Sequence, residues 1–310
     1  MKHTFIISCI CSMMLFACKK DEKIGPPAEL EHDYTLPQGN APAAANDKIQ
    51  QLYNTYGSYF LYVFTQKDFV WVPSTGGSAS KIDTAVLGKP EYVMDMLTFL
   101  DDVWLKFLPE SFKKAQGIPY RVLLADTIKT NRGPGYPPNM QYLYSDYKVI
   151  DKAICFAGMN DSLRRMTPAD KVKRKNVLTS AIWAYYLQNK IVEIPASFYK
   201  LTDYVTAPAY PINAINNPAN LEAFRQRGFL PGSYNPVSGA ASEWYYGTYS
   251  WGTAQPTDAN AYILHLTTRT DAQMAAYLKY PLIKQKFDLL VAYFKSAYNI
   301  DVRAIANATY

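Results

Sequence analysis

The sequence has little histidine and little cysteine, and this limits the chemistry it can carry. It contains three histidines and four cysteines in 310 residues. A catalytic zinc site normally takes three protein ligands, often histidines, and a disulfide framework needs paired cysteines. Cys9 and Cys11 lie in the apolar amino-terminal stretch, and Cys155 lies in an apolar run typical of a buried, inert thiol. We therefore expect no disulfide within the chain and no cysteine nucleophile.

The chain also lacks long runs of one charge. Its 32 basic and 26 acidic residues give a net charge of +6, and the densest basic group is Lys171 to Lys175. Nucleic-acid binding normally requires a concentrated basic patch, so we expect no nucleic-acid partner. We interpret residues 171–175 as a solvated basic helix face, with an anion site as the alternative. A Gly-x-Ser-x-Gly elbow and a dinucleotide fingerprint are both missing from the sequence.

The amino terminus has the order of a secretory signal. Residues 1–17 place Lys2 before an apolar run that is too short for a transmembrane span. The tetrad Leu15-Phe16-Ala17-Cys18 resembles a bacterial lipobox, which predicts lipidation of Cys18. The charged run at 19–23 resembles a surface-export signal of Bacteroidota lipoproteins. We therefore predict a signal peptide at 1–17, a lipidated Cys18 with a flexible tether through residue 45, and an outer-membrane lipoprotein exposed at the cell surface.

The rest of the chain alternates helical and extended patterns. Apolar residues recur at three- and four-residue steps after Asp47, after Pro90 and from Ile283 to Tyr298. Thr167 as cap, Pro168 and Asp170 mark the start of another helix. Strands are predicted at 69–72, 120–125, 140–149 and 152–157. These patterns predict an α+β fold in one domain, 46–310, with a small mixed sheet of about four strands packed with several helices.

Three blocks carry a resemblance to a known family. They are residues 53–62 (YNTYGSYFLY), residues 194–204 (IPASFYKLTDY), and Arg227-Gly228-Phe229 with the later helix opening at Thr257. Their order and spacing resemble the zinc-binding metallopeptidase lipoproteins found beside outer-membrane nutrient importers of Bacteroidota. The resemblance spans most of residues 47–305. It implies a zincin-like fold and, as partners, the outer membrane and components of an importer.

The chain departs from this family where the chemistry would take place. Such a peptidase needs H-E-x-x-H on a helix, because the four-residue step puts both imidazoles toward zinc and the Glu activates the bound water. Aligned through Pro195, the corresponding residues are Ser180, Ala181 and Ala184. Both ligands and the general base are therefore missing, and we expect no catalytic residues and no zinc cofactor.

Two weak candidates for metal binding remain. Asp258 stands where the family has acidic residues, and His265 follows it by seven residues, a spacing that can share one helix face. Two ligands fall short of a three-ligand site. The apolar context of His265 instead favours a hydrogen-bonded core histidine.

A third feature is an aromatic segment that favours binding rather than catalysis. Residues 243–252 contain Trp244, Tyr245, Tyr246, Tyr249 and Trp251, whose rings could stack on sugars or peptide side chains. The alternative is a loop that packs as core over the cleft from which the zinc ligands are missing. The bulky residues Trp183, Tyr185 and Tyr186 favour this alternative.

The leading hypothesis is a non-catalytic pseudo-metallopeptidase that acts as a binding or accessory component of an outer-membrane nutrient-import system, with a peptide or glycan as ligand. A divergent zinc metallohydrolase and a surface glycan-binding lipoprotein are the alternatives.

Overall fold

A computed structural model describes residues 33–70, 83–133, 135–206, 218–235, 238, 240–242 and 251–310. Residues 36–310 form one compact unit. Among the described residues, no helix combines the length and the hydrophobicity of a membrane span. The predicted signal peptide and Cys18 lie outside the described residues.

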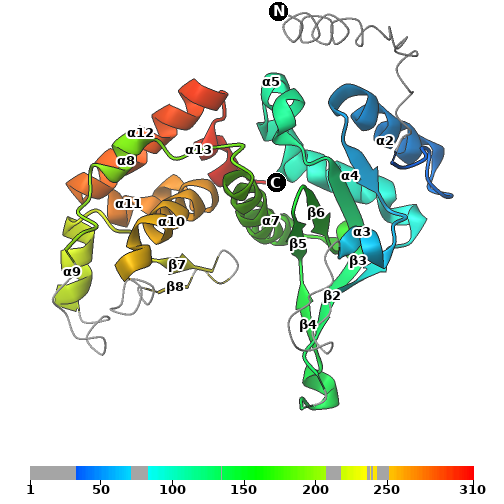
Figure 1. The fold of residues 1–310 in the computed structure, drawn as a ribbon, viewed down its shortest axis with the longest axis horizontal. Coiled ribbons are helices and arrows are strands. Elements are labelled where there is room, and N and C mark those ends of the chain that lie inside the picture. Colours follow the sequence, from blue (N-terminus) through cyan, green and yellow to red (C-terminus); the bar gives the residue numbers. More distant parts are fainter. Residues whose placement is uncertain are drawn as a thin grey trace, which may run out of the picture. The chain divides into compact units, whose positions relative to one another are not determined.

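Six strands form the main sheet: β1 (Tyr59–Leu61), β2 (Asp83–Leu87), β3 (Arg121–Asn131), β4 (Tyr142–Ser145), β5 (Tyr147–Ile150) and β6 (Ala153–Phe156). The first half of β3 pairs in parallel with β1 on one side and with β6 on the other, and β5 closes that edge antiparallel to β6. The second half of β3 pairs antiparallel with both β2 and β4, which lie beyond the helix-covered part of the sheet in Figure 1.

Helices before and within the sheet region cover its core. They are α2 (Ala43–Tyr56), α3 (Gln66–Phe69), α4 (Val93–Val103), α5 (Glu110–Phe112) and α6 (Ser162–Arg165), with short helical turns at Pro90–Tyr92, Leu105–Phe107, Lys113–Gly117 and Pro138–Met140. The apolar stripes of α2 and α4 are buried, as their spacing predicts.

The carboxyl-terminal half is helical. Its elements are α7 (Pro168–Gln188), α8 (Ala196–Tyr199), α9 (Pro218–Gln226), α10 (Ala254–Thr268), α11 (Asp271–Leu278), α12 (Pro281–Tyr298) and α13 (Val302–Ala306), with a helical turn at Trp251–Thr253 and a small hairpin of β7 (Ser233–Tyr234) and β8 (Ala241–Ser242). The central helix α7 packs against β5 and β6 of the sheet and against α10 (Figure 1). One core cluster of buried side chains joins the two halves.

The α+β class is confirmed, but the details of the sheet differ from the prediction. The sheet has six strands rather than about four, and the strand predicted at 69–72 is wrong at its start. Phe69 instead ends α3, because Thr65 caps that helix and Asp68 bonds back to the backbone N–H of Thr65. Residues 71 and 72 lie outside the described residues.

The folded part of the chain begins earlier than the predicted tether boundary. The helix whose apolar pattern was predicted after Asp47 starts earlier, at Ala43, after Pro42. Gln38 donates to the carbonyl of Val63 at 2.8 Å and accepts from the backbone of Tyr62 at 3.0 Å. The segment from Leu36 to Ala45 therefore belongs to the packed unit.

Candidate functional site

Helix α7 starts as local sequence signals predict. Thr167 accepts a hydrogen bond from the backbone N–H of Asp170 at 3.2 Å, and Pro168 occupies the first turn. The carboxylate of Asp170 sits at the positive end of the helix, and the Thr167 hydroxyl donates to it at 2.6 Å, so its pKa lies below the usual value. These interactions fix the residue at which α7 begins.

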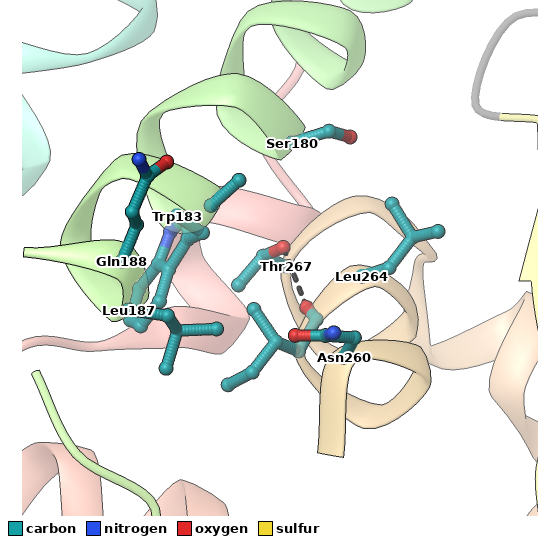
Figure 2. Close-up of a pocket in the computed structure, with 9 residues that line it drawn as sticks. Ser180, Trp183, Leu187, Gln188, Asn260, Leu264 and Thr267 are labelled. Atoms are coloured by element: carbon teal, nitrogen blue, oxygen red, sulfur yellow. Dashed lines mark hydrogen bonds between the residues drawn. The ribbon is translucent and has the colours of Figure 1, made fainter. Parts of the chain in front are cut away.

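A groove of about 510 Å³ lies between α7 and α10. Figure 2 shows Ser180, Trp183, Leu187 and Gln188 of α7 on one side and Asn260, Leu264 and Thr267 of α10 on the other. Ala184 and Ile263 complete the described lining. None of these nine residues carries an ionisable side chain, so the described walls supply no charge and no general base.

The groove contains two of the three residues that the sequence resemblance aligned with a zinc motif. Ser180 and Ala184, one turn apart, both line it, whereas Ala181 is fully buried on another face. The Ser180 hydroxyl donates within its own helix to the carbonyl of Asn176 at 2.9 Å. The polar side-chain groups that line the groove among the described residues are hydroxyls and primary amides, which are poor zinc ligands. The described lining therefore does not fit a zinc ion.

Aromatic side chains pack α7 against its neighbours beside the groove. Trp183 and Tyr186 are buried and pack edge to face, and the Trp183 ring lies 5.0 Å from that of Phe294 on α12. The Tyr186 hydroxyl donates to the carbonyl of Gly117 at 2.7 Å and accepts from the indole of Trp104 at 3.0 Å. These contacts hold α7 rigidly, and the groove next to them stays open.

Asp258, a weak metal candidate, is engaged by a lysine. Its side chain is fully buried and forms an ion pair with Lys286 of α12, which is equally buried. The Tyr204 hydroxyl donates to the same carboxylate oxygen at 2.5 Å. The other oxygen, Oδ1, has no hydrogen-bond partner within the described residues. Burial raises the pKa of Asp258, against the attraction of Lys286.

Aromatic rings enclose the lysine partner. The ammonium of Lys286 lies 4.4 Å from the ring centre of Phe198 and 4.6 Å from that of Tyr262. It also donates to Thr202 at 3.1 Å and to the carbonyl of Gly228 at 3.2 Å. Burial lowers its pKa. The cluster joins the segment after α8 to α10 and α12. The Asp258 carboxylate that a metal would need is already paired with Lys286.

His265, the other weak metal candidate, lies in a separate part of the core. Its Nε2 is 3.0 Å from the carbonyl oxygen of Pro231, and its ring makes tilted contacts with the rings of Tyr234 and Tyr277, at centre-to-centre distances of 5.2 and 6.2 Å. Burial, followed by the nearby charge of Arg269, lowers its pKa to about 3. Asp258 and His265 therefore have different partners. In the described part of the chain, no group of three or more His, Cys, Asp or Glu side chains is arranged to hold a metal.

The aromatic segment cannot be placed. Trp244, Tyr245, Tyr246 and Tyr249 lie outside the described residues, and the side chain of Trp251 does too. Cys155 is described and is fully buried, which raises the pKa of its thiol.

The basic start of α7 differs from the interpretation of a solvated face. Lys175 is fully buried and donates to the carbonyl of Ile305 at 2.6 Å, and burial lowers its pKa to about 8. Arg174 donates to the carbonyl of Ala157 and lines a polar cavity of about 400 Å³ with Asp126 and Asp146. Only Lys171 and Lys173 pair at the surface, with Asp102 and Asp170. No local sequence signal marks this cavity, because its walls come from β3, β4, the loop after β6 and α7.

Comparisons with known proteins give one weak likeness. No family model matches the chain, and no curated protein matches it. Among solved structures, a protein from Bacteroides caccae described as a candidate zinc-binding metallo-peptidase is similar at 13% identity with a TM-score of 0.45, over 86% of this chain and 92% of that chain. A likeness at this TM-score is too weak to transfer an activity or a metal to this chain.

Proposed function

We propose that this chain is a non-catalytic, surface-exposed lipoprotein that binds a ligand in the groove between α7 and α10, as an accessory component of an outer-membrane nutrient-import system. The observation that carries the proposal is the groove lining. Ser180 and Ala184 stand where a zinc peptidase needs ligands, and the groove between them and α10 is open but free of ionisable side chains among its nine described residues.

The chemistry of the walls supports an uncharged ligand. Trp183, Leu187, Ile263 and Leu264 supply apolar surface, and the primary amides of Gln188 and Asn260 each offer donors and an acceptor. A buried charge without a partner is costly, so this lining selects against acidic and basic groups. A short uncharged peptide segment fits such walls, with its amide groups paired to the two primary amides.

The setting at the outer membrane rests on the sequence. The lipobox tetrad ending at Cys18 supports lipidation, and the three family blocks support a place beside a nutrient importer. Metabolic labelling with a tagged fatty acid tests the first point, with Cys18→Ala as the unlabelled control.

Filling the groove tests the binding site. Ala184 and Ala276 are both exposed alanines within helices, and only Ala184 lines the groove. We expect an end-capped library of uncharged pentapeptides, read by affinity selection and mass spectrometry, to be retained by the wild type and by Ala276→Trp, and to be lost by Ala184→Trp. Equal retention by Ala184→Trp, or a preference for acidic or basic peptides, would contradict the proposed site.

A further inference from the structure

The structure concentrates exposed hydrophobic side chains in one part of the sheet. We call this part the β arm: β2, the second half of β3 from Asp126, the described residues 132–133 and 135–141 that connect β3 to β4, and β4. Ten large hydrophobic residues are exposed in the described chain, and all but Val63, Tyr120 and Val205 lie in the arm. These seven are Val86, Leu87, Tyr136, Met140, Tyr142, Leu143 and Tyr144.

Strand β4 is the clearest case. Its three successive residues Tyr142, Leu143 and Tyr144 are 37%, 57% and 66% exposed. Neighbouring residues of a strand point to opposite faces, so both faces of β4 meet solvent. The strand pairs with β3 alone within the described sheet, and β2 occupies the other side of β3 (Figure 1). The arm thus presents apolar rings and chains on both of its faces.

The arm carries two acidic side chains, Asp83 and Asp126, and two basic ones, Lys129 and Arg132. From Thr127 to Ser145 the sequence has Lys129 and Arg132 and no Asp or Glu. The guanidinium of Arg132 lies 3.8 Å from the ring centre of Tyr136, and the ammonium of Lys129 lies 4.8 Å from that of Tyr142. Both carboxylates of the arm have partners: Asp83 is bonded to Thr130 and Lys148, and Asp126 accepts from Asn160 at 2.5 Å and from Thr127 at 3.3 Å.

Tyrosines beside basic residues and exposed aliphatic chains are typical of a membrane–water interface. Tyrosine rings settle at the level of the headgroups, and lysine and arginine reach anionic headgroups while their stems lie along apolar surface. An acidic protein partner could meet the same charges, but the exposure of apolar side chains on both faces of a narrow arm favours insertion into a fluid surface over docking onto a fixed one.

The proposed lipidation of Cys18 would hold the domain close to a membrane surface. Seventeen residues, 19–35, separate Cys18 from Leu36, where the compact unit begins. An extended chain of that length spans at most about 60 Å, whereas the radius of gyration of a domain of this size is about 19 Å. The domain can therefore turn any face, including the arm, toward the membrane. Lipid anchoring is more stable when two signals act together.

We propose that the β arm is a second membrane-binding element, which inserts Met140, Leu143 and its tyrosines at the headgroup level of an anionic lipid surface. The proposed lipidation supplies proximity to the membrane, but the arm itself binds lipid without the acyl chains.

The test uses the mature chain, residues 18–310, with Cys18→Ala so that no lipid is attached. In flotation assays we expect it to bind vesicles of phosphatidylcholine with phosphatidylglycerol, less so as salt rises, and to leave pure phosphatidylcholine vesicles largely unbound. The triple variant Tyr142→Ser/Leu143→Ser/Tyr144→Ser should bind roughly tenfold or more weakly. The pair Lys129→Glu/Arg132→Glu should lose the preference for anionic vesicles.

The matched control replaces exposed hydrophobic residues outside the arm, Val63→Ser/Tyr120→Ser/Val205→Ser, and should bind as the parent does. Circular dichroism melting confirms that each variant is folded. Failure of the parent to bind anionic vesicles, equal losses in both triple variants, or vesicle binding by the arm triple variant equal to that of the parent would each overturn the proposal. Failure of fatty-acid labelling at Cys18 would overturn lipidation and leave the vesicle result standing.

Discussion

The protonation state of His265 gives a quantitative test of whether this residue is a buried, neutral core histidine. The ring is buried against Tyr234 and Tyr277, and its pKa of about 3 compares with 6.5 in an unfolded chain. Between these two pH values the unfolded chain binds a proton that the folded chain does not. Stability is therefore complete above pH 6.5 and is lost as the pH falls toward 3.

The size of the effect follows from the shift. A difference of one pKa unit corresponds to about 1.4 kcal/mol, so His265 accounts for about 5 kcal/mol of the stability lost between pH 6.5 and 3. His265→Gln retains a donor for the carbonyl of Pro231 but does not titrate. We expect urea unfolding, followed by fluorescence at several pH values, to show a shallower loss of stability with acid in His265→Gln than in the wild type.

Carboxylates titrate in both proteins, so the difference between the two curves isolates the histidine. Parallel curves for wild type and His265→Gln would show that the imidazole protonates freely in the folded state, and would refute its burial as a neutral core residue.

Two further predictions concern the buried lysines. Lys286→Met should destabilise the fold by roughly 3–5 kcal/mol, because it leaves the buried carboxylate of Asp258 without its ion-pair partner. Adding Asp258→Leu should recover much of that loss, as measured by chemical denaturation. A double variant no more stable than Lys286→Met would argue against an ion pair. The pKa of Lys175 is about 8 in the folded chain and 10.5 in the unfolded chain, so the free energy of unfolding should rise by about 3 kcal/mol as the pH rises from 8 to 10.5. Lys175→Met should not show this rise. Equal dependence of stability on pH in the wild type and in Lys175→Met would contradict the burial of Lys175.

Local signals in the sequence predicted those parts of the fold that depend on neighbouring residues. The start of α7 follows from Thr167, Pro168 and Asp170, which interact within one helical turn. The strand predicted at 69–72 was wrong at its start for the same reason, because the capping pair Thr65 and Asp68 is an equally local signal that favours the helix ending at Phe69.

Features built from distant segments could not be read from the sequence. Lys175 lies in a basic run that predicts exposure, yet its acceptor is the carbonyl of Ile305, 130 residues away. The partner of Asp258 is likewise on another helix. The sequence resemblance predicted Ser180, Ala181 and Ala184 as the positions of the missing zinc motif. Only packing against α10 shows that Ser180 and Ala184 line an open groove and that Ala181 is buried.

The exposed residues of β4 illustrate the same limit. Tyr142, Leu143 and Tyr144 have high β propensity, and the sequence predicts a strand there. Burial of such residues is the usual outcome, and their exposure follows from the way the second half of β3 carries β2 and β4 beyond the helix-covered sheet.

The central claim is that the groove between α7 and α10 binds without catalysis. The most direct measurement is metal analysis of the purified mature chain, carrying Cys18→Ala, after equilibration with zinc and desalting, combined with a peptidase assay with and without a chelator. We expect substoichiometric zinc, no cleavage, and a melting temperature unchanged by the chelator. One tightly held zinc ion per chain, with cleavage that the chelator abolishes, would contradict the claim.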